Sequence, residues 1–137
     1  MKASLIIQSY KDLVALELIL DALRCQTYKN FKVIVAEDNN APETRSFLER
    51  YSDLAIIHNQ HPILAAPRQP RKTKRYAAPR EFTDGDCIPY STLIEGHVKL
   101  SSRKTIISGR RGYLPENRST RLRNNLKTII SGIASVI

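Results

Sequence analysis

The chain has 137 residues, of which 42% are hydrophobic and 26% charged, and these fractions are typical of a globular protein with an apolar core. It is too short for two full domains, and its apolar runs fall short of the roughly 18 to 20 residues that a membrane-spanning helix needs. The net charge of +9 arises after residue 60, where fifteen basic and five acidic side chains lie, and this excess indicates attraction to phosphate groups on a nucleotide, a nucleic acid or a membrane.

The first residues and the cysteines bear on the compartment in which the protein is expected. "MKASLII" lacks the long apolar region and small-residue cleavage site of a secretory signal. Cys25 and Cys87 have neither metal-binding nor redox spacing, which suits a reducing compartment. We therefore expect a cytoplasmic protein, with peripheral attachment to the inner face of the membrane as a further option for its basic second half.

The first elements form a strand, a helix and a strand. Residues 3–10 and 31–38 are short apolar runs that end in polar side chains, as strands buried on both faces do. Residues 11–27 between them repeat leucine at helical spacing. Such a crossover makes the two strands parallel, and ligands of these sheets bind beyond the carboxyl ends of the strands. Tyr10 and Asp38 are predicted to lie at that edge.

A second helix and strand follow, and the pattern then breaks. Pro42 is typical of a helix start, and this helix is expected to run to about Tyr51, followed by a strand over residues 54–58. Residues 62–79 contain four prolines and indicate a loop. Basic side chains crowd this loop and its end: Arg68, Arg71, Lys72, Lys74, Arg75 and Arg80.

The last third of the chain predicts three further elements. Residues 89–100 fit a helix that buries Leu93, Ile94 and Val98, and residues 104–109 fit a strand. From Glu116 onward, basic and apolar residues alternate as in a basic amphipathic helix. We therefore expect a domain over residues 1–115 and a tail over residues 116–137.

Two carboxylates stand one residue apart in "EFTDGDCIP". Asp84 and Asp86 repel each other unless a cation lies between them. A divalent metal site and a solvated surface turn both explain such a pair, and the tripeptide alone does not decide between them.

Three stretches resemble a known family. "SLIIQSYKD", "LRCQTYKNFKVIVAEDN" and "FTDGDCIPYSTLIEGHVK" resemble, in order and spacing, the N-terminal catalytic portion of family-2 nucleotide-sugar glycosyltransferases. The resemblance covers most of residues 3–115. It implies an α/β, Rossmann-like, three-layer A-type fold with a mainly parallel sheet, here incomplete.

The resemblance implies a role for the acidic pair. Asp84 and Asp86 match the Asp-X-Asp motif, which engages Mn²⁺ or Mg²⁺ bridging the two phosphates of a nucleotide-sugar donor. Hard oxygen ligands suit these ions, and the cation offsets the charge that grows on the departing diphosphate. Gly85 would let the backbone turn closely around the ion.

Further positions match the nucleotide pocket of the family. Asp38 matches a carboxylate that accepts a hydrogen bond from the base, and Gln8 and Tyr10 match residues lining the same pocket. Arg75 corresponds to a basic residue near the diphosphate, where a guanidinium can bind phosphate through two hydrogen bonds. Each has a plainer alternative: a capping or turn carboxylate for Asp38, a half-buried aromatic for Tyr10, and a solvated basic loop for Arg75.

The chain departs from the family in two places. Relatives have a helix and a strand before the Asp-X-Asp motif, whereas only "PREFT" separates it from "RYAA" here, so that strand is barely long enough to pair. After Asp86 the only carboxylates are Glu95 and Glu116, and neither matches the family's catalytic base. No catalytic residue is assigned. We expect a truncated catalytic domain that binds donor but transfers sugar slowly or not at all by itself.

Three classes of function remain open at this point. The resemblance favours transfer from a nucleotide-diphosphate sugar to a glycan or lipid-linked acceptor. A phosphate-binding module that holds nucleic acid is the alternative, but the late basic clusters lack the interleaved aromatics that stack on bases. The third class is an interaction domain whose apolar tail pairs with a partner chain.

Overall fold

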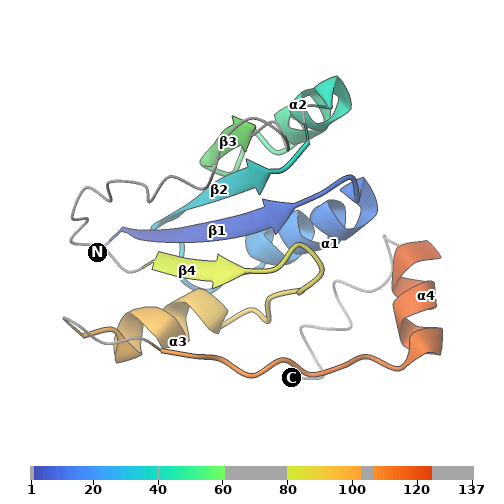
Figure 1. Cartoon of the computed structure of the whole chain (residues 1–137). Helices are drawn as coiled ribbons and strands as arrows, with labels where there is room; N and C mark the ends of the chain where they lie inside the picture. Colours follow the sequence, from blue (N-terminus) through green and yellow to red (C-terminus); the bar gives the residue numbers. More distant parts are fainter. Residues whose placement is uncertain (1, 40, 61–79, 103–106, 125–137) are drawn as a thin grey trace, which may run out of the picture. The chain divides into compact units, whose positions relative to one another are not determined.

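The computed structural model describes residues 2–39, 41–60, 80–102 and 107–124 (Figure 1). The chain divides into two compact units. The first comprises Met1–Lys11 and Asn30–Asp84, and the second comprises Asp12–Lys29 and Gly85–Ile137. Within the described residues, no helix is both long and apolar enough to cross a membrane.

In the part of the first unit that the structure describes, four strands form an all-parallel sheet of order β3-β2-β1-β4 (Figure 1). Its strands are β1 (Ala3–Ser9), β2 (Phe31–Glu37), β3 (Ile56–Gln60) and β4 (Arg80–Thr83). The reversal of strand order between β3 and β4 makes this a doubly wound sheet, in which β1 and β2 are central. The expected parallel α/β architecture is therefore present.

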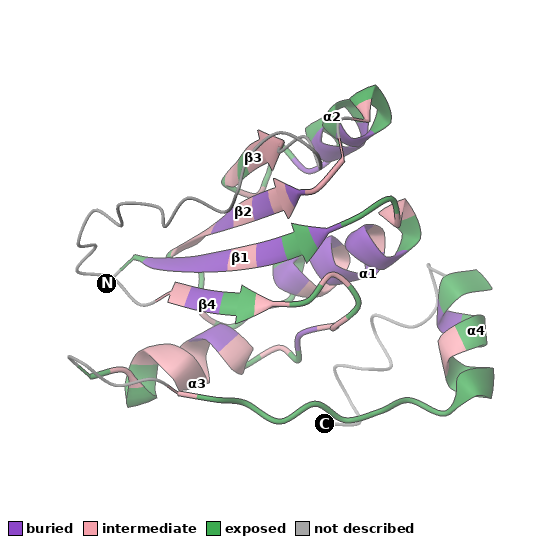
Figure 2. Ribbon diagram, in the orientation of Figure 1, coloured by how far each residue is buried: buried purple, intermediate pink, exposed green. Residues whose placement is uncertain are grey.

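One face of the sheet carries the apolar core of the first unit. Successive side chains of a strand alternate between faces, so Leu5 and Ile7 of β1 share a face with Val33 and Val35 of β2. These four side chains are at most 1% exposed. Figure 2 shows β1 mostly buried, and β2 alternating between buried and intermediate positions along its second half.

The opposite face carries an apolar row with a different environment. The strand register aligns Phe82, Ile6, Ile34 and Ile57 across all four strands. The two members on the edge strands are exposed, Phe82 to 75% and Ile57 to 43%. A parallel sheet is normally covered on both faces, so this row is apolar in sequence without being buried at its ends.

Helix α2 (Pro42–Glu49) also belongs to the first unit. Pro42 occupies the first helical turn, where its missing N–H costs nothing. The helix was expected to reach about Tyr51, and it ends at Glu49, followed by a turn that buries Tyr51. The next strand was expected at residues 54–58 but lies at Ile56–Gln60. The reason is that the turn after α2 extends through Ser52 to Leu54.

The described residues of the second unit form three helices, α1 (Leu13–Arg24), α3 (Leu93–Leu100) and α4 (Glu116–Asn124). Asp12 caps α1 by accepting a hydrogen bond from the backbone N–H of Ala15 at 3.0 Å. The predicted leucine stripe of α1 is buried at Leu16, Leu20 and Leu23.

Several expectations for the later elements need correction. The helix expected over residues 89–100 begins at Leu93, and of its three predicted core residues only Ile94 is fully buried. Residues 107–109 of the strand expected at 104–109 have no regular structure, and residues 103–106 lie outside the described residues, as does the loop at 62–79. The "EFT" segment, by contrast, pairs with β1 from Ser4 to Ile7, so four residues suffice for a strand here.

Candidate functional site

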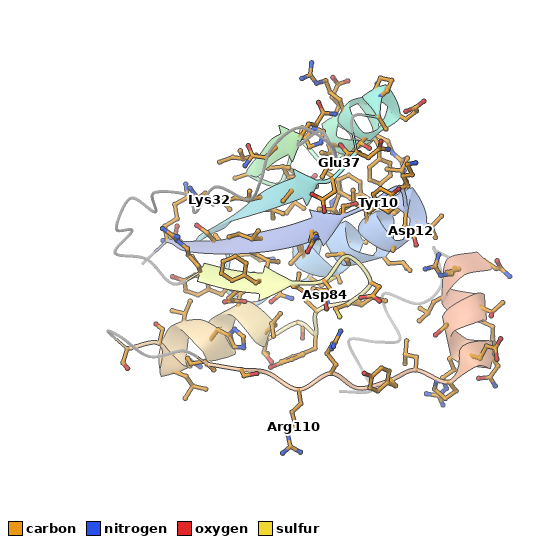
Figure 3. The ribbon with its side chains drawn as sticks, viewed as in Figure 1. Tyr10, Asp12, Lys32, Glu37, Asp84 and Arg110 are labelled. Atoms are coloured by element: carbon orange, nitrogen blue, oxygen red, sulfur yellow. The ribbon has the colours of Figure 1, made fainter. Side chains whose placement is uncertain are left out.

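Three strands of the first unit end at a common edge. Ser9 of β1 is in register with Glu37 of β2, and Ile7 of β1 is in register with Thr83 of β4. Tyr10, Asp38 and Asp84 directly follow these strand ends. Figure 3 shows the labelled side chains of Tyr10, Glu37 and Asp84 at the arrowheads of their strands. The edge where parallel strands end is where doubly wound sheets bind ligands.

Two of the predicted pocket residues contact each other directly. The Gln8 amide Nε2 donates a hydrogen bond to Asp38 Oδ2 at 2.9 Å. The Asp38 backbone N–H donates to the carbonyl of Ser9 at 3.2 Å, which extends the pairing of β1 and β2 by one residue. Helix α2 has Ala41 at its N-cap and no side-chain cap, so Asp38 does not cap it. The Asp38 carboxylate is instead oriented by Gln8 at the strand edge.

Tyr10 presents its ring to solvent. Tyr10 is 54% exposed, which is more than expected for a half-buried aromatic residue that packs against its neighbours. The ammonium of Lys11 lies 5.2 Å from the centre of the ring, within range of a cation–π contact. Lys11 has a φ of 51°, in the left-handed region, where a side chain with a Cβ costs about 1 kcal/mol. This strained turn follows β1 directly.

The Asp-X-Asp turn brings its ligand atoms together. Carboxylate oxygens of Asp84 and Asp86 and the Cys87 sulfur lie within 4.8 Å of one another, along one continuous stretch of chain. Both aspartates are exposed. Gly85 does not use the left-handed conformation, since none of the described glycines has a positive φ. Two exposed carboxylates at this separation fit Mg²⁺ or Mn²⁺, which bind one or two carboxylates together with substrate phosphates.

Cys87 adds a sulfur to this turn. Its Sγ lies 3.5 Å from Asp86 Oδ1 and 3.9 Å from Arg111 Nη1. Burial raises the pKa of the Cys87 thiol, so the thiol is protonated at neutral pH. Sulfur is a soft ligand, whereas Mg²⁺ and Mn²⁺ prefer oxygen, which favours the two carboxylates as the ligands of a hard cation.

The second unit contains an ion pair that sequence reasoning did not identify. Arg123 of α4 binds both oxygens of Asp12, at 2.9 Å and 3.4 Å. The Arg123 hydrogen bond lowers the pKa of Asp12, and the Asp12 hydrogen bond, with a smaller contribution from the charge of Asp86, raises the pKa of Arg123. The two residues are 111 positions apart, and no local sequence signal relates them. Arg110, in contrast, is exposed and extends away from the chain around it (Figure 3).

Glu37 is a buried carboxylate that sequence reasoning also missed. It is 1% exposed and sits beside Asp38 at the end of β2. Its oxygens accept hydrogen bonds from Thr44 Oγ1 at 2.6 Å and Gln60 Nε2 at 3.3 Å, and one lies 2.8 Å from His58 Nε2. The signal in the sequence was its spacing. Glu37 follows Val33 and Val35 at intervals of two residues, so it points to the same inward face of the strand. Its contacts join β2, α2 and β3 behind the edge.

One predicted site residue, Arg75, and one carboxylate to which no role was assigned, Glu95, stand apart from these groups. Arg75 lies outside the described residues. Glu95, one of the two carboxylates that follow the Asp-X-Asp motif, forms an ion pair with Lys99 at 2.6 Å and accepts a hydrogen bond from Thr27 Oγ1 at 2.6 Å. The hydrogen bond from Lys99 lowers the pKa of Glu95, which makes it a weaker base than an isolated carboxylate.

The fold is similar to that of solved structures. TarS of S. aureus superposes with a TM-score of 0.56 and 24% sequence identity over 70% of this chain. Residues 1–349 of TarS in complex with UDP give the same TM-score, identity and share of this chain. The chain has the A-type glycosyltransferase fold.

The chain spans only part of the length of these solved structures. The chain spans 18% of the length of TarS and 30% of its 1–349 fragment. A mannosyltransferase from Pyrobaculum calidifontis, solved with GDP-Man and Mn²⁺, matches with a TM-score of 0.48 and 21% identity over 63% of this chain and 28% of its own. No protein-family model matches the chain, and no curated protein sequence does.

Proposed function

We propose that the chain binds a nucleotide-diphosphate sugar through a divalent metal, as the donor-binding part of a glycosyltransferase domain. The observation that carries this proposal is the common edge of the sheet, where Gln8 holds Asp38 at 2.9 Å and where Asp84 follows a strand paired with β1. An α/β sheet that binds a nucleotide does so at this edge. The A-type fold supports the same reading, since the similar TarS fragment was solved with UDP.

Asp84 and Asp86 are the metal ligands in this proposal. Their carboxylates lie close enough to share one ion, and Mg²⁺ or Mn²⁺ keeps further positions for phosphate oxygens. The bound cation would offset the negative charge that develops on the leaving diphosphate. Asp84 would also border the nucleotide, because it directly follows β4 at the shared edge.

The base and ribose would lie over Tyr10 and Asp38. The exposed ring of Tyr10 offers a face for stacking, and the Asp38 carboxylate, oriented by Gln8, offers an acceptor for a base N–H. Arg75 is proposed as a diphosphate ligand on the sequence resemblance alone. Residues 1–115 are proposed as the nucleotide-sugar-binding domain and residues 116–137 as a basic amphipathic tail.

Donor binding and sugar transfer are separable in this chain. Glu95 is engaged by Lys99 and Thr27, which argues against it as the base that deprotonates an acceptor hydroxyl. We therefore expect the isolated chain to bind donor and to transfer sugar slowly or not at all. The acceptor class proposed is a glycan or a lipid-linked saccharide, with the protein in the cytoplasm or held at the inner face of the membrane.

Donor binding is tested by titration with UDP and GDP, with and without Mn²⁺, for the unmodified chain and for Asp84→Ala and Asp86→Ala. Each variant should lose affinity roughly 10-fold or more, since even an outer partner of a metal ligand contributes 10- to 100-fold. Calorimetry measures this directly. Glu49→Ala removes the same charge from the exposed end of α2 and should leave binding unchanged.

The same titration addresses the alternative, a nucleic-acid-binding module. The concentration of positive charge after residue 60 favours that class. It predicts binding of RNA or DNA that weakens steeply with salt and does not depend on Mn²⁺ or on the aspartates. Metal-independent nucleotide binding that survives both aspartate substitutions would contradict the donor-site proposal.

A further inference from the structure

Gln26 is a buried polar residue with no role in the site described above. It lies just past the end of α1 and is 1% exposed. It belongs to the "QTY" segment on which the family resemblance partly rests. Both polar atoms of its side chain are used, and both bind backbone groups that lie more than 60 residues away in sequence.

The two hydrogen bonds of Gln26 hold the start of α3. Its Nε2 donates to the carbonyl of Tyr90 at 2.7 Å, and its Oε1 accepts from the backbone N–H of Ile94 at 3.2 Å. The N–H groups of a first helical turn have no partner within the helix. Thr92, at the N-cap position of α3, makes no side-chain cap, so Gln26 supplies that cap from its position just past the end of α1.

The backbone of the neighbouring residue strengthens this attachment. The Thr27 backbone N–H donates to the carbonyl of Ser91 at 2.9 Å. The Thr27 hydroxyl makes a separate, exposed contact with Glu95, which plays no part in the attachment. Residues 26 and 27 therefore fix the chain at Tyr90, Ser91 and the first turn of α3. All of these residues, like Asp86, belong to the second compact unit.

The attachment lies close behind the metal-binding turn. Only Cys87, Ile88 and Pro89 separate Asp86 from the clamped carbonyl of Tyr90. Pro89 is buried and has a fixed φ, so this connection has few ways to move. A carboxylate that is held in place before the ion arrives binds it more tightly, because less conformational entropy is lost on binding.

We propose that Gln26 is a positioning residue for the metal site, acting through Tyr90 and Ile94 on the placement of Asp86. This rests on the proposed function, in which Asp86 is a metal ligand. Gln26 does not touch the ion. Its amide sets where the chain leaves the Asp-X-Asp turn, and the metal affinity depends on that placement.

The test is the affinity for Mn²⁺ alone, measured by electron paramagnetic resonance of the free ion during titration of the full chain. Gln26→Met keeps the side-chain size and removes both hydrogen bonds. Gln26→Glu keeps an acceptor for Ile94 and replaces the donor to Tyr90 with a charged oxygen. Both should raise the Kd for Mn²⁺ roughly 10-fold, the effect typical of residues that orient a metal ligand.

The matched control is Thr27→Val. Thr27 is the residue next to Gln26. The substitution removes the exposed hydroxyl contact with Glu95, and it keeps the backbone bond to Ser91 and both bonds of Gln26. It should leave the Kd for Mn²⁺ unchanged. A residue that only stabilised the fold would lower the thermal midpoint in a Gln26 variant and leave its Kd equal to that of the control.

A second measurement needs no substitution and stands if a Gln26 variant fails to fold. Coupling between two events is reciprocal, so a clamp that favours metal binding must itself be stabilised by the metal. Saturating Mg²⁺ should slow amide hydrogen exchange of the peptide covering residues 88–96 in the unmodified chain. Exchange of α2, in the other unit, serves as the reference.

The outcomes distinguish this inference from the proposed function. If the unmodified chain binds Mn²⁺ and the Gln26 variants bind it equally well, with exchange of residues 88–96 unaffected by Mg²⁺, the positioning role is overturned and the donor site stands. If the unmodified chain binds no Mn²⁺, with or without UDP, both are overturned. A weaker Kd in the Gln26 variants alone, or metal-dependent protection of residues 88–96, supports the role.

Discussion

Glu37 and Asp38 are adjacent carboxylates in very different surroundings. Glu37 is buried and bound by Thr44, His58 and Gln60, whereas Asp38 is partly exposed and bound by Gln8. Strand alternation explains the difference, because the last residue of β2 points inward and the next residue begins the loop. The sequence resemblance predicts Asp38 as a ligand-facing residue, and the strand alternation would also have predicted Glu37 as internal.

Glu81 is a second carboxylate that alternation places inward. It is 6% exposed and in register with buried Leu5, and loss of hydration on burial raises its pKa from 4.5 to about 7. The charged form is therefore disfavoured in the folded chain. In the unfolded chain Glu81 loses its proton near its ordinary pKa.

The pH dependence of stability tests this carboxylate. Between about pH 4.5 and pH 7 the folded chain retains a proton that the unfolded chain has released, so stability falls as the pH rises through this window. At 1.36 kcal/mol per pKa unit the loss is about 3 kcal/mol. Glu81→Gln should remove it. Urea unfolding of both proteins from pH 4 to pH 8 measures the difference, and parallel stability curves would contradict the shift.

The secondary-structure elements were predictable to different degrees, for identifiable reasons. β1, α1 and β2 have strong patterns, since long apolar runs and a leucine stripe at helical spacing leave few alternatives. β4 has four residues and the reverse pattern, with Glu81 buried and Phe82 exposed, so its pairing with β1 could not be read from the sequence. The start of α3 depends on Gln26, a contact 68 residues away along the chain.

The junction of β2, α2 and β3 depends on one buried carboxylate. Thr44 of α2 donates a hydrogen bond to Glu37 at 2.6 Å and is 4% exposed. Thr44→Val keeps the side-chain shape and removes this donor. Because a hydrogen bond to a charged group contributes about 1.5 to 3 kcal/mol, we expect the free energy of unfolding to fall by about 2 kcal/mol in urea denaturation.

Thr92→Val is the matched control for this substitution. Thr92 is exposed and makes no side-chain capping bond, so the same chemical change should alter stability by less than about 0.5 kcal/mol. If the two substitutions changed the free energy of unfolding equally, the hydrogen bond from Thr44 to Glu37 would make no specific contribution to stability.

For the molecule taken together, the position of the candidate site follows from topology more than from any motif. Parallel strands end at one edge, so Tyr10, Asp38 and Asp84 meet there once the strands are recognised. The Asp12–Arg123 pair joins α1 to α4 across 111 residues and has no counterpart in the local sequence. The chain spans under a third of the solved TarS fragment, and the proposed donor edge lies within the described residues of its first unit.

The donor site is tested most directly by a crystal structure of the chain with UDP and Mn²⁺, using anomalous scattering to locate the metal. The proposal predicts one manganese peak between the carboxylates of Asp84 and Asp86. The diphosphate should lie beside that peak, and the uracil should lie against Tyr10 and Asp38. Manganese bound away from these two aspartates would contradict the proposed function. So would UDP bound elsewhere, with no metal between the carboxylates of Asp84 and Asp86.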